Sequence, residues 1–447
     1  MKRFSRLLIC LTLLFALGLS GCGQPVTDTS LGAESSALTS DEVSFGEVVS
    51  EQDSSKETSS KESEAQVMRL QNAYKLLTEE KKLTIGYIGG SITHGYSAAT
   101  VIENGKVVST DGSIRDNYVH RVSAWFKSVF PDAEIETINA GIGDTTTNFA
   151  LYRLESHLMN NNGHDIPDIV FIEFTTNDAG SYETTVTQLE SLINNILEIN
   201  PYCEIVIIST NVYGGDAKAA HKDVALNYKF LFADVGQALQ DAKIERGAAS
   251  ESDGTYYYTV DNLHPSSAGY ALYTEKIVYL LEYHLSKGTG EMINRKETLP
   301  ASLSKHPLVT NPVMITGHDM LLTGDAEVVE TALTAGMYGM AEKGSQVPVC
   351  DSFVKANNGS TATIKFSGSY LGVLFGLTKD GVNIRYCIDG GEWKEFLIDS
   401  QNRSGQRYDH SKTFAFASDL SQGDHTLVIE FNSDTPIRLG AVLVNGR

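Results

Sequence analysis

The stretch KLTIGYIGGSITHGYSA, residues 82–98, decides the fold. It begins as a run of apolar and β-forming residues from Leu83 to Ile88, which is typical of a strand buried on both faces of a parallel sheet. The run stops at Gly89-Gly90-Ser91 and does not resume. A serine in this place is either part of an ordinary turn or a nucleophile held at the carboxyl end of the strand, where such sheets carry their sites.

From about residue 66 to 288, apolar runs alternate with amphipathic stretches. Strands are predicted at 82–89, 133–141, 168–175, 204–210 and 255–261, and helical stretches at 117–130, 149–159, 186–200, 217–246 and 267–285. Five strand-then-helix units with nearly continuous apolar strands predict a parallel sheet covered on both faces. The sequence therefore predicts an α/β domain.

The pattern changes from about residue 306 to 447. Short alternating runs such as TATIKFSG (361–368), YLGVLFGL (370–377) and HTLVIEF (425–431) are separated by clusters of Gly, Asp, Asn and Ser. This spacing predicts an all-β domain of the sandwich type. The boundary falls near residues 286–302. Cys203 is predicted to be a buried thiol, and the residues leave open whether Cys350 and Cys387 pair.

Residues 1–65 precede the predicted domains. Residues 1–22 combine Lys2, Arg3 and Arg6 with an apolar run too short for a membrane span, which indicates an export signal. Their end, Leu19-Ser20-Gly21-Cys22, resembles the lipobox of bacterial lipoproteins, which implies cleavage before Cys22 and a lipid on its thiol. The alternative is a plain signal peptide with a chance cysteine. Residues 23–65 are rich in Ser and acidic residues, which predicts a disordered tether.

The net charge of −21 argues against two kinds of partner. Nucleic acid needs clustered Lys and Arg to bind its phosphates, and electrostatic attraction to anionic lipid needs them too. No nucleic-acid partner is therefore expected, and contact with a membrane is expected only through lipid on Cys22.

Polar residues follow the predicted strands. The ends of four strands carry Ser91, then Gly143 and Asp144, then Asn177 and Asp178, and last Asp261 and His264. Because the carboxyl ends of parallel strands meet at one edge, these residues are expected to gather there.

This set has the parts needed for acyl transfer. A serine hydroxyl needs a base such as His264 to take its proton, and a carboxylate such as Asp261 fixes the histidine tautomer. Backbone N–H groups and an amide such as Asn177 can stabilise the oxyanion. Taken singly, each residue has a plainer interpretation as a turn or cap, which also applies to Asp178. Glu173 is predicted to be a buried, paired carboxylate and is assigned no role.

Four segments resemble the motif blocks of the SGNH (GDSL-like) hydrolases. These are IGGSITHG (88–95), NAGIGDTT (139–146), EFTTND (173–178) and DNLHP (261–265), in the order typical of the family. The resemblance covers roughly residues 80–290. It implies a flavodoxin-like three-layer αβα fold and ester hydrolysis at Ser91, with Asp261 and His264 completing the triad and no metal or organic cofactor.

The glycine block departs from the family pattern at one position. Many relatives have a second glycine where this chain has Asp144. The implied oxyanion hole consists of Ser91, Asn177 and a backbone N–H of Gly143, with Asp144 as the alternative to Gly143.

Together these features predict an exported, lipid-anchored serine esterase acting on short acyl esters, foremost acetyl, on a carbohydrate. The serine block resembles that of carbohydrate esterases in the family, and the β-domain resembles a sandwich found in some deacetylating relatives. The alternatives are a lipase or thioesterase of the same fold, and a non-catalytic glycan-binding surface lipoprotein. The glycan, the acyl position, the oligomeric state and the role of the β-domain stay open.

Overall fold

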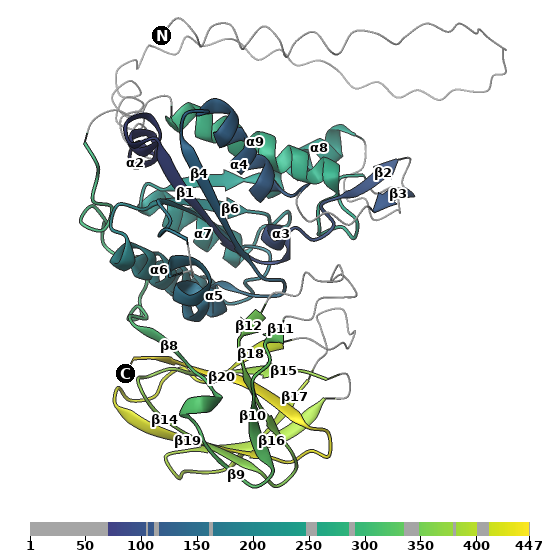
Figure 1. Ribbon diagram of the computed structural model, residues 1–447, viewed down its shortest axis with the longest axis vertical. Coiled ribbons are helices and arrows are strands. Elements are labelled where there is room, and N and C mark those ends of the chain that lie inside the picture. The colour runs from purple at the N-terminus through teal and green to yellow at the C-terminus, as the bar shows by residue number, and fades with distance from the viewer. Residues whose placement is uncertain are drawn as a thin grey trace, which may run out of the picture. The chain divides into compact units, whose positions relative to one another are not determined.

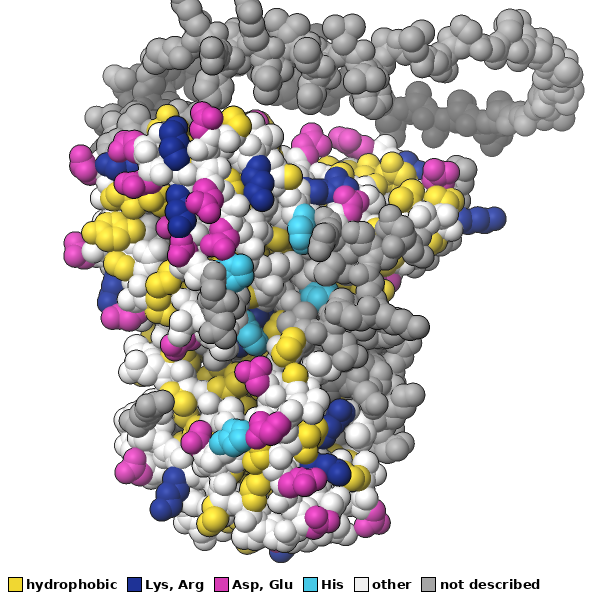
Figure 2. All heavy atoms as spheres, viewed as in Figure 1, with side chains coloured by type: hydrophobic (Ala, Val, Ile, Leu, Met, Phe, Trp, Pro, Cys, Tyr) yellow, Lys and Arg dark blue, Asp and Glu magenta, His cyan; other side chains and the backbone are white. Residues whose placement is uncertain are grey.

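The computed structural model describes residues 70–103, 106–110, 116–160, 164–246, 257–285, 291–334, 348–378, 381–399 and 411–446. The predicted signal peptide, Cys22 and the tether lie outside these residues. Among the helices that are described, none is both long and apolar enough to cross a membrane. On the face drawn in Figure 2, Lys and Arg side chains are interspersed with Asp and Glu.

The α/β domain contains five parallel strands in the spatial order β4-β1-β5-β6-β7. Their bounds are β1 Lys82–Gly89, β4 Glu134–Gly141, β5 Ile169–Glu173, β6 Glu204–Ser209 and β7 Leu231–Asp234. This is the 2-1-3-4-5 order of flavodoxin-like folds, so the predicted fold class is confirmed. Figure 1 shows the sheet with α4, α8 and α9 on one side and α5 and α6 on the other. The register places Gly89 beside Gly141 and Glu173, so the ends of three strands are level.

Helices cover both faces of the sheet. One apolar cluster joins the strands to α5 Thr147–Leu154, α6 Tyr182–Ile199 and α7 Asp216–Asn227. The other joins them to α2 Gln71–Lys75, α4 Tyr118–Val129, α8 Val235–Glu245 and α9 Ser267–Leu285. Neighbouring residues of β1 alternate between the clusters, Ile88 in the first and Tyr87 in the second, as the strand period requires.

Two shorter features interrupt this pattern. Helix α3, Ser91–His94, follows β1 directly, and a hairpin of β2 Thr100–Glu103 and β3 Lys106–Thr110 follows α3. Helices α2 and α5 each continue into a π-helical turn, Leu76–Glu80 and Glu155–Met159.

The predicted fifth strand is wrong. Residues 257–260 form no strand apart from a single bridge between Thr259 and Pro265, and residues 255–256 are outside the described part. The fifth strand is instead β7, which divides the predicted helix 217–246 into α7 and α8. A four-residue edge strand between two helices is too short to show its own period, whereas the tyrosine run has high β-propensity. Asp261 and His264 therefore lie on a loop before α9.

The C-terminal domain consists of antiparallel strands, as predicted. One sheet has the order β10-β13-β20-β15-β18 with β8 paired to β20, and the other has the order β17-β16-β19-β14-β9; β11 and β12 pair separately. A core cluster with residues from both sheets, among them Val373 and Ile429, makes the domain a sandwich. Its strands are β8 Pro312–Ile315, β9 Leu321–Thr323, β10 Ala326–Val329, β11 Leu333–Thr334, β12 Pro348–Cys350, β13 Phe353–Ala356, β14 Thr361–Ser367, β15 Leu371–Gly376, β16 Val382–Ile388, β17 Lys394–Ile398, β18 Ser411–Ala417, β19 Asp424–Phe431 and β20 Ile437–Asn445.

The three cysteines of the described residues are free and buried. They are Cys203, Cys350 and Cys387. Cys203 is the buried thiol that the sequence predicts, and the possible pair of Cys350 with Cys387 is not formed.

The segment that follows α9 is fixed to the α/β domain by two buried carboxylates. Glu204 accepts two hydrogen bonds from the Arg295 guanidinium, of 2.8 and 2.9 Å. Glu190 accepts the backbone N–H groups of Leu303 and Ser304 at 2.8 and 2.9 Å. Both carboxylates are fully buried. Residues 295–304 are therefore held as part of this domain.

Candidate active site

The two glycines that end β1 make room for the side chains around Ser91. A Cβ on Gly89 would lie 2.0 Å from Thr93 Oγ1, and a Cβ on Gly90 would lie 2.8 Å from Asn177 Nδ2. Real Cβ atoms do not approach so closely, so any larger residue would displace Thr93 or Asn177. The Gly-Gly-Ser sequence thus allows the strand to turn into α3 while Asn177 lies against the backbone next to Ser91.

Ser91, His264 and Asp261 form a continuous hydrogen-bond chain. Ser91 Oγ lies 2.8 Å from His264 Nε2, and His264 Nδ1 lies 2.7 Å from Asp261 Oδ2. Ser91 and His264 are largely buried, at 8% and 7% exposure. Ser91 lies 173 positions before His264 on the chain, and the fold brings the three residues into the geometry of a nucleophile, a base and an orienting carboxylate.

The Asp261 carboxylate is held in its ionised form. Loss of solvent around it acts to raise its pKa, but hydrogen bonds from the His264 side chain and from the backbone N–H groups of His264 and Leu263 outweigh this. The net effect lowers the pKa of Asp261 below its usual value. The two backbone bonds to Oδ1, of 2.7 and 3.1 Å, also fix the direction in which the carboxylate points.

The loop that carries His264 is attached to the rest of the site through α9. Tyr270, fully buried on this helix, places its hydroxyl 3.0 Å from Ile92 O and 2.9 Å from Tyr96 O, just beyond Ser91. The ring of Tyr96 in turn packs edge-on against the imidazole of His264, with centroids 4.3 Å apart. These contacts join the serine segment to the histidine segment.

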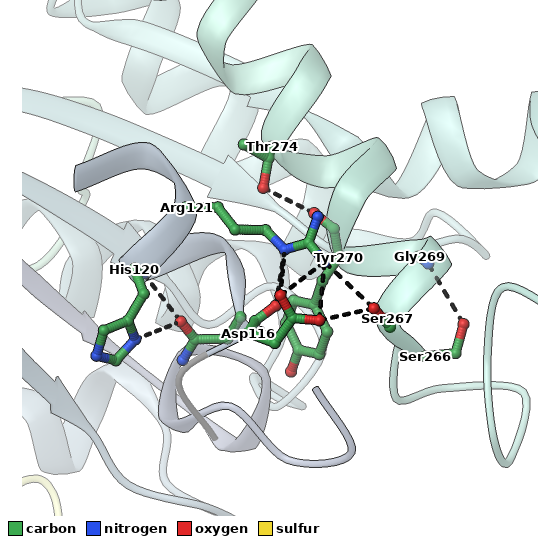
Figure 3. Close-up of polar contacts among 9 residues, drawn as sticks. Asp116, His120, Arg121, Ser266, Ser267, Gly269, Tyr270 and Thr274 are labelled. Atoms are coloured by element: carbon green, nitrogen blue, oxygen red, sulfur yellow. Dashed lines mark hydrogen bonds and ion pairs between the residues drawn. The ribbon is translucent and has the colours of Figure 1, made fainter. Parts of the chain in front are cut away.

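A second attachment lies at the first turn of α9. Figure 3 shows Arg121 and Ser267 converging on the Asp116 carboxylate. Arg121 Nη2 and Ser267 Oγ lie 2.8 and 2.7 Å from Asp116 Oδ2. Helix α9, which begins three residues after His264, is therefore also fixed to the start of α4.

The asparagine and glycine blocks meet beside Ser91. Asn177 Nδ2 donates to the carbonyl of Thr145 at 2.8 Å. Gly141 lies so close to α3 that a Cβ would be 2.3 Å from His94 N. Gly143 is buried, and Asp144 is exposed with φ +59°. A left-handed conformation favours glycine and is tolerated by aspartate, so this backbone is compatible with the glycine that the family resemblance leads one to expect at this position.

The structure also brings in residues that the sequence analysis did not assign. Asp178 Oδ2 lies 2.9 Å from His221 Nε2 and 2.6 Å from Thr147 Oγ1 at the start of α5. Arg153 and Glu173 are buried and contact the backbone of Gly89 and Gly90, just before Ser91. Arg153 had a sequence signal, since it lies four residues after Phe149 on the apolar face of a predicted helix. His221 had none, because its contact with Asp178 depends on how α7 packs.

Two of these buried groups have strongly shifted pKa values. Burial raises the pKa of Glu173 to about 7, against the hydrogen bonds it accepts from Thr210, Thr93 and Gly90. Burial lowers the pKa of Arg153 to about 9. Across the described residues, no three His, Cys, Asp or Glu side chains are grouped so that they could hold a metal ion.

Comparison with known proteins gives matches to a family and to solved structures. Residues 87–272 match the model of the GDSL-like lipase/acylhydrolase family. No curated protein matches the chain. Two structures of a two-domain esterase active on acetylated mannans, one co-crystallised with mannopentaose, have TM-scores of 0.66 and 0.65 at 20% identity. They cover 85% of this chain, which covers 97% and 96% of them.

The similarity to these structures extends over both domains and supports the fold described above. The family match includes the serine, glycine, asparagine and histidine blocks, since it runs from before Ser91 to beyond His264. The α/β domain of this chain therefore belongs to the GDSL-like lipase/acylhydrolase (SGNH) family, and the protein is a carboxylic ester hydrolase.

Proposed function

We propose that this protein is an exported serine esterase that removes short acyl groups, foremost acetyl, from a carbohydrate. The observation that carries the proposal is the hydrogen-bond chain from Ser91 Oγ through His264 to Asp261, with links of 2.8 and 2.7 Å. Serine is the nucleophile, histidine the general base, and aspartate the group that orients the histidine and stabilises its charged form.

In the first half-reaction Ser91 Oγ attacks the carbonyl carbon of the ester while His264 Nε2 takes its proton. The carbonyl oxygen becomes an oxyanion, which is stabilised by the backbone N–H of Ser91, the backbone N–H of Gly143 and the amide of Asn177, with the Asp144 N–H as the alternative to that of Gly143. The tetrahedral intermediate collapses, and His264 returns the proton to the departing sugar oxygen. The product is an acyl-serine and a free sugar hydroxyl.

In the second half-reaction water replaces the sugar. His264 takes a proton from the water as its oxygen attacks the acyl carbon, and the same donors stabilise the second oxyanion. Collapse returns the proton to Ser91 Oγ and releases the carboxylic acid. Asp261 remains ionised throughout, which agrees with the lowering of its pKa.

Two observations support a carbohydrate ester over a lipid or thioester. The two-domain esterase that resembles this chain over both domains is active on acetylated mannans. The export signal and the Cys22 lipobox would place the enzyme outside the cytoplasm, where glycans are found. A lipid on Cys22 would anchor it to the membrane through the tether of residues 23–65.

The test of the activity is acetate release from acetylated mannan, acetylated xylan and peptidoglycan, alongside a long-chain ester and an acyl thioester. We expect the wild type to be most active on an acetylated glycan, and Ser91→Ala to lose activity while keeping the wild-type melting temperature. If the wild type prefers the long-chain ester or the thioester, the substrate is a lipid ester or a thioester and not a carbohydrate ester. A folded Ser91→Ala protein with wild-type turnover would overturn the mechanism.

The test of location is fractionation of cells expressing the wild type or Cys22→Ala. The wild type should be found with membranes and carry lipid on Cys22, and the variant should be unprocessed or released. Wild-type protein that stays with membranes without lipid on Cys22 would contradict the proposed anchor.

A further inference from the structure

Two buried ionisable side chains contact opposite ends of the Gly89–Gly90 peptide unit, which is separated from Ser91 by one further peptide bond. Arg153 Nη2 donates to Gly89 O at 3.2 Å. The N–H of Gly90 donates to Glu173 Oε2 at 3.4 Å and to the Glu173 carbonyl at 3.3 Å. Gly89 C=O and Gly90 N–H belong to one planar group, so these contacts act on a single rigid plane.

Both side chains are hydrogen-bonded, but neither has an oppositely charged partner among the described residues. Arg153 is 0% and Glu173 1% exposed, and in the described part of the chain neither forms an ion pair. Burying an ionisable group without an oppositely charged partner is costly, so stabilisation of the sheet edge does not by itself account for these two residue types. The pKa values of both groups are shifted by this burial, as noted above.

The other contacts of the two side chains lead to opposite sides of the site. Arg153 donates to Ala140 O at 2.6 Å, near the end of β4 and inside the glycine block. Glu173 accepts from Thr93 Oγ1 of α3 at 2.9 Å and from Thr210 Oγ1 at 2.7 Å. The Arg153 guanidinium therefore joins the Gly89–Gly90 peptide to the segment that carries the glycine block. The Glu173 carboxylate joins the same peptide to α3, the helix that begins at Ser91.

We propose that Arg153 and Glu173 are positioning residues that fix the Gly89–Gly90 peptide plane and thereby aim Ser91 at His264 and the oxyanion donors. A shift of this plane would displace Gly90 Cα and, through it, the following peptide that carries the Ser91 N–H and the Ser91 side chain. A displacement of about 1 Å at a reacting group lowers the rate roughly 10²-fold, so a small shift is enough to matter. The inference rests on the proposed function, since it assigns these residues an effect on the Ser91 nucleophile.

The first experiment compares Glu173→Gln with Glu190→Gln. Glu190 is a matched control because it is also a fully buried carboxylate that accepts backbone N–H groups, but it holds residues 303–304. The measurements are kcat and KM on p-nitrophenyl acetate, the rate of Ser91 modification by a fluorophosphonate, and the melting temperature. Glu173→Gln should lower kcat and the modification rate by about 10–10²-fold, with KM within about twofold. Glu190→Gln should lower only the melting temperature.

The second experiment adds Arg153→Met and the double variant. Because both side chains act on one peptide plane, the kcat of the double variant should stay within about threefold of the more impaired single variant, instead of falling by the product of the two losses. If Arg153→Met does not fold, Thr93→Val takes its place, since it removes the hydroxyl that Glu173 holds at 2.9 Å in α3.

A folded Glu173→Gln protein with wild-type kcat and modification rate would overturn the inference. Equal kcat losses in Glu173→Gln and Glu190→Gln at equal melting temperature would overturn it too. These outcomes can be distinguished from the outcomes that would contradict the proposed function. If Ser91→Ala is inactive while Glu173→Gln is unaffected, only the positioning role is wrong. If Ser91→Ala remains active, the nucleophile itself is wrong.

Discussion

Two aspartate–histidine pairs lie near the carboxyl edge of the sheet, and their hydrogen bonds are similar. Asp261 Oδ2 lies 2.7 Å from His264 Nδ1, and Asp178 Oδ2 lies 2.9 Å from His221 Nε2. In each pair the other carboxylate oxygen accepts a backbone N–H, that of His264 itself in the first pair and that of Thr147 in the second. The two pairs therefore share their central geometry.

They differ in what the second nitrogen of each histidine faces. His264 Nε2 faces Ser91 Oγ, whereas His221 Nδ1 has no hydrogen-bond partner among the described residues. The two pairs also differ in their access to solvent. The second pair is enclosed, with the His221 side chain fully buried, whereas the first pair is open to solvent at Asp261, whose side chain is 42% exposed. Asp178 also binds the Thr147 hydroxyl, so the second pair braces the start of α5. An aspartate–histidine pair becomes catalytic only through what the remaining nitrogen can reach.

The strongest test of this difference is the same substitution in both histidines. Glutamine keeps much of the size and polarity of histidine but is not a base. His264→Gln should lower kcat by roughly 10⁴–10⁶-fold, and His221→Gln by less than about threefold per folded molecule. The measurements are kcat on an acetyl ester and the melting temperature of each variant. A large loss of kcat in His221→Gln without unfolding would mean that the second pair is not merely a brace.

The next test concerns the carboxylate of the first pair. Asp261→Asn preserves shape but removes the charge that stabilises the imidazolium, and it permits the wrong histidine tautomer. We expect a fall in kcat of about 10³–10⁴-fold with an unchanged fold. Near-normal activity would show that another group orients His264.

Substitution of Asn177 should lower kcat less than substitution of His264 or Asp261, and more than substitution of His221 or Asp178. Its amide is expected to bind the oxyanion, and loss of one such donor costs about 2.7–4 kcal/mol, or roughly 10²–10³-fold in kcat. Asn177→Ala should fall in this range with little change in KM, because the interaction strengthens only in the transition state. Asn177→Asp should be at least as impaired, since an ionised carboxylate repels the oxyanion. Folded variants with wild-type kcat would remove Asn177 from the site.

The smallest effect on catalysis is expected at Asp178. Asp178→Asn keeps an oxygen for the N–H of Thr147 but removes the charge beside His221. It should cost about 1–3 kcal/mol of stability and lower kcat less than about tenfold. Urea unfolding and kcat measured on the same preparation separate these effects. A kcat loss as large as that of Asn177→Ala would show that the Asp178–His221 pair controls the position of the oxyanion donors.

Most of the sheet and the four motif residues could be predicted from the sequence. The strands β5 and β6 and most of β1 are apolar runs, β4 carries apolar residues at intervals, and the rule that parallel strands carry sites at their carboxyl ends places Ser91 and Asn177 at one edge. The edge strand β7 could not be predicted in this way, because four residues between two helices show no period of their own. This error did not change which residues were expected to meet, because His264 reaches Ser91 from a loop instead of a strand end.

The supporting contacts could not be predicted, because they depend on packing between distant segments. The sequence marks Glu173 as buried, and the family resemblance marks Asp144 as a departure from an expected glycine. Neither shows which peptide Glu173 contacts or that the backbone at Asp144 is left-handed. Asp178 and His221 are 43 residues apart, and no local pattern joins them.

The contacts of residues 295–304 with the α/β domain have a consequence for proteins cut between the two domains. A chain ending at residue 288 would contain every motif block but lack Arg295, leaving Glu204 buried and without its cation. Loss of one partner from a buried ion pair costs about 3–5 kcal/mol, a large part of the stability of an ordinary domain. A proteolytic fragment or shortened gene product that retains esterase activity should therefore extend beyond Ser304, well past the last motif residue.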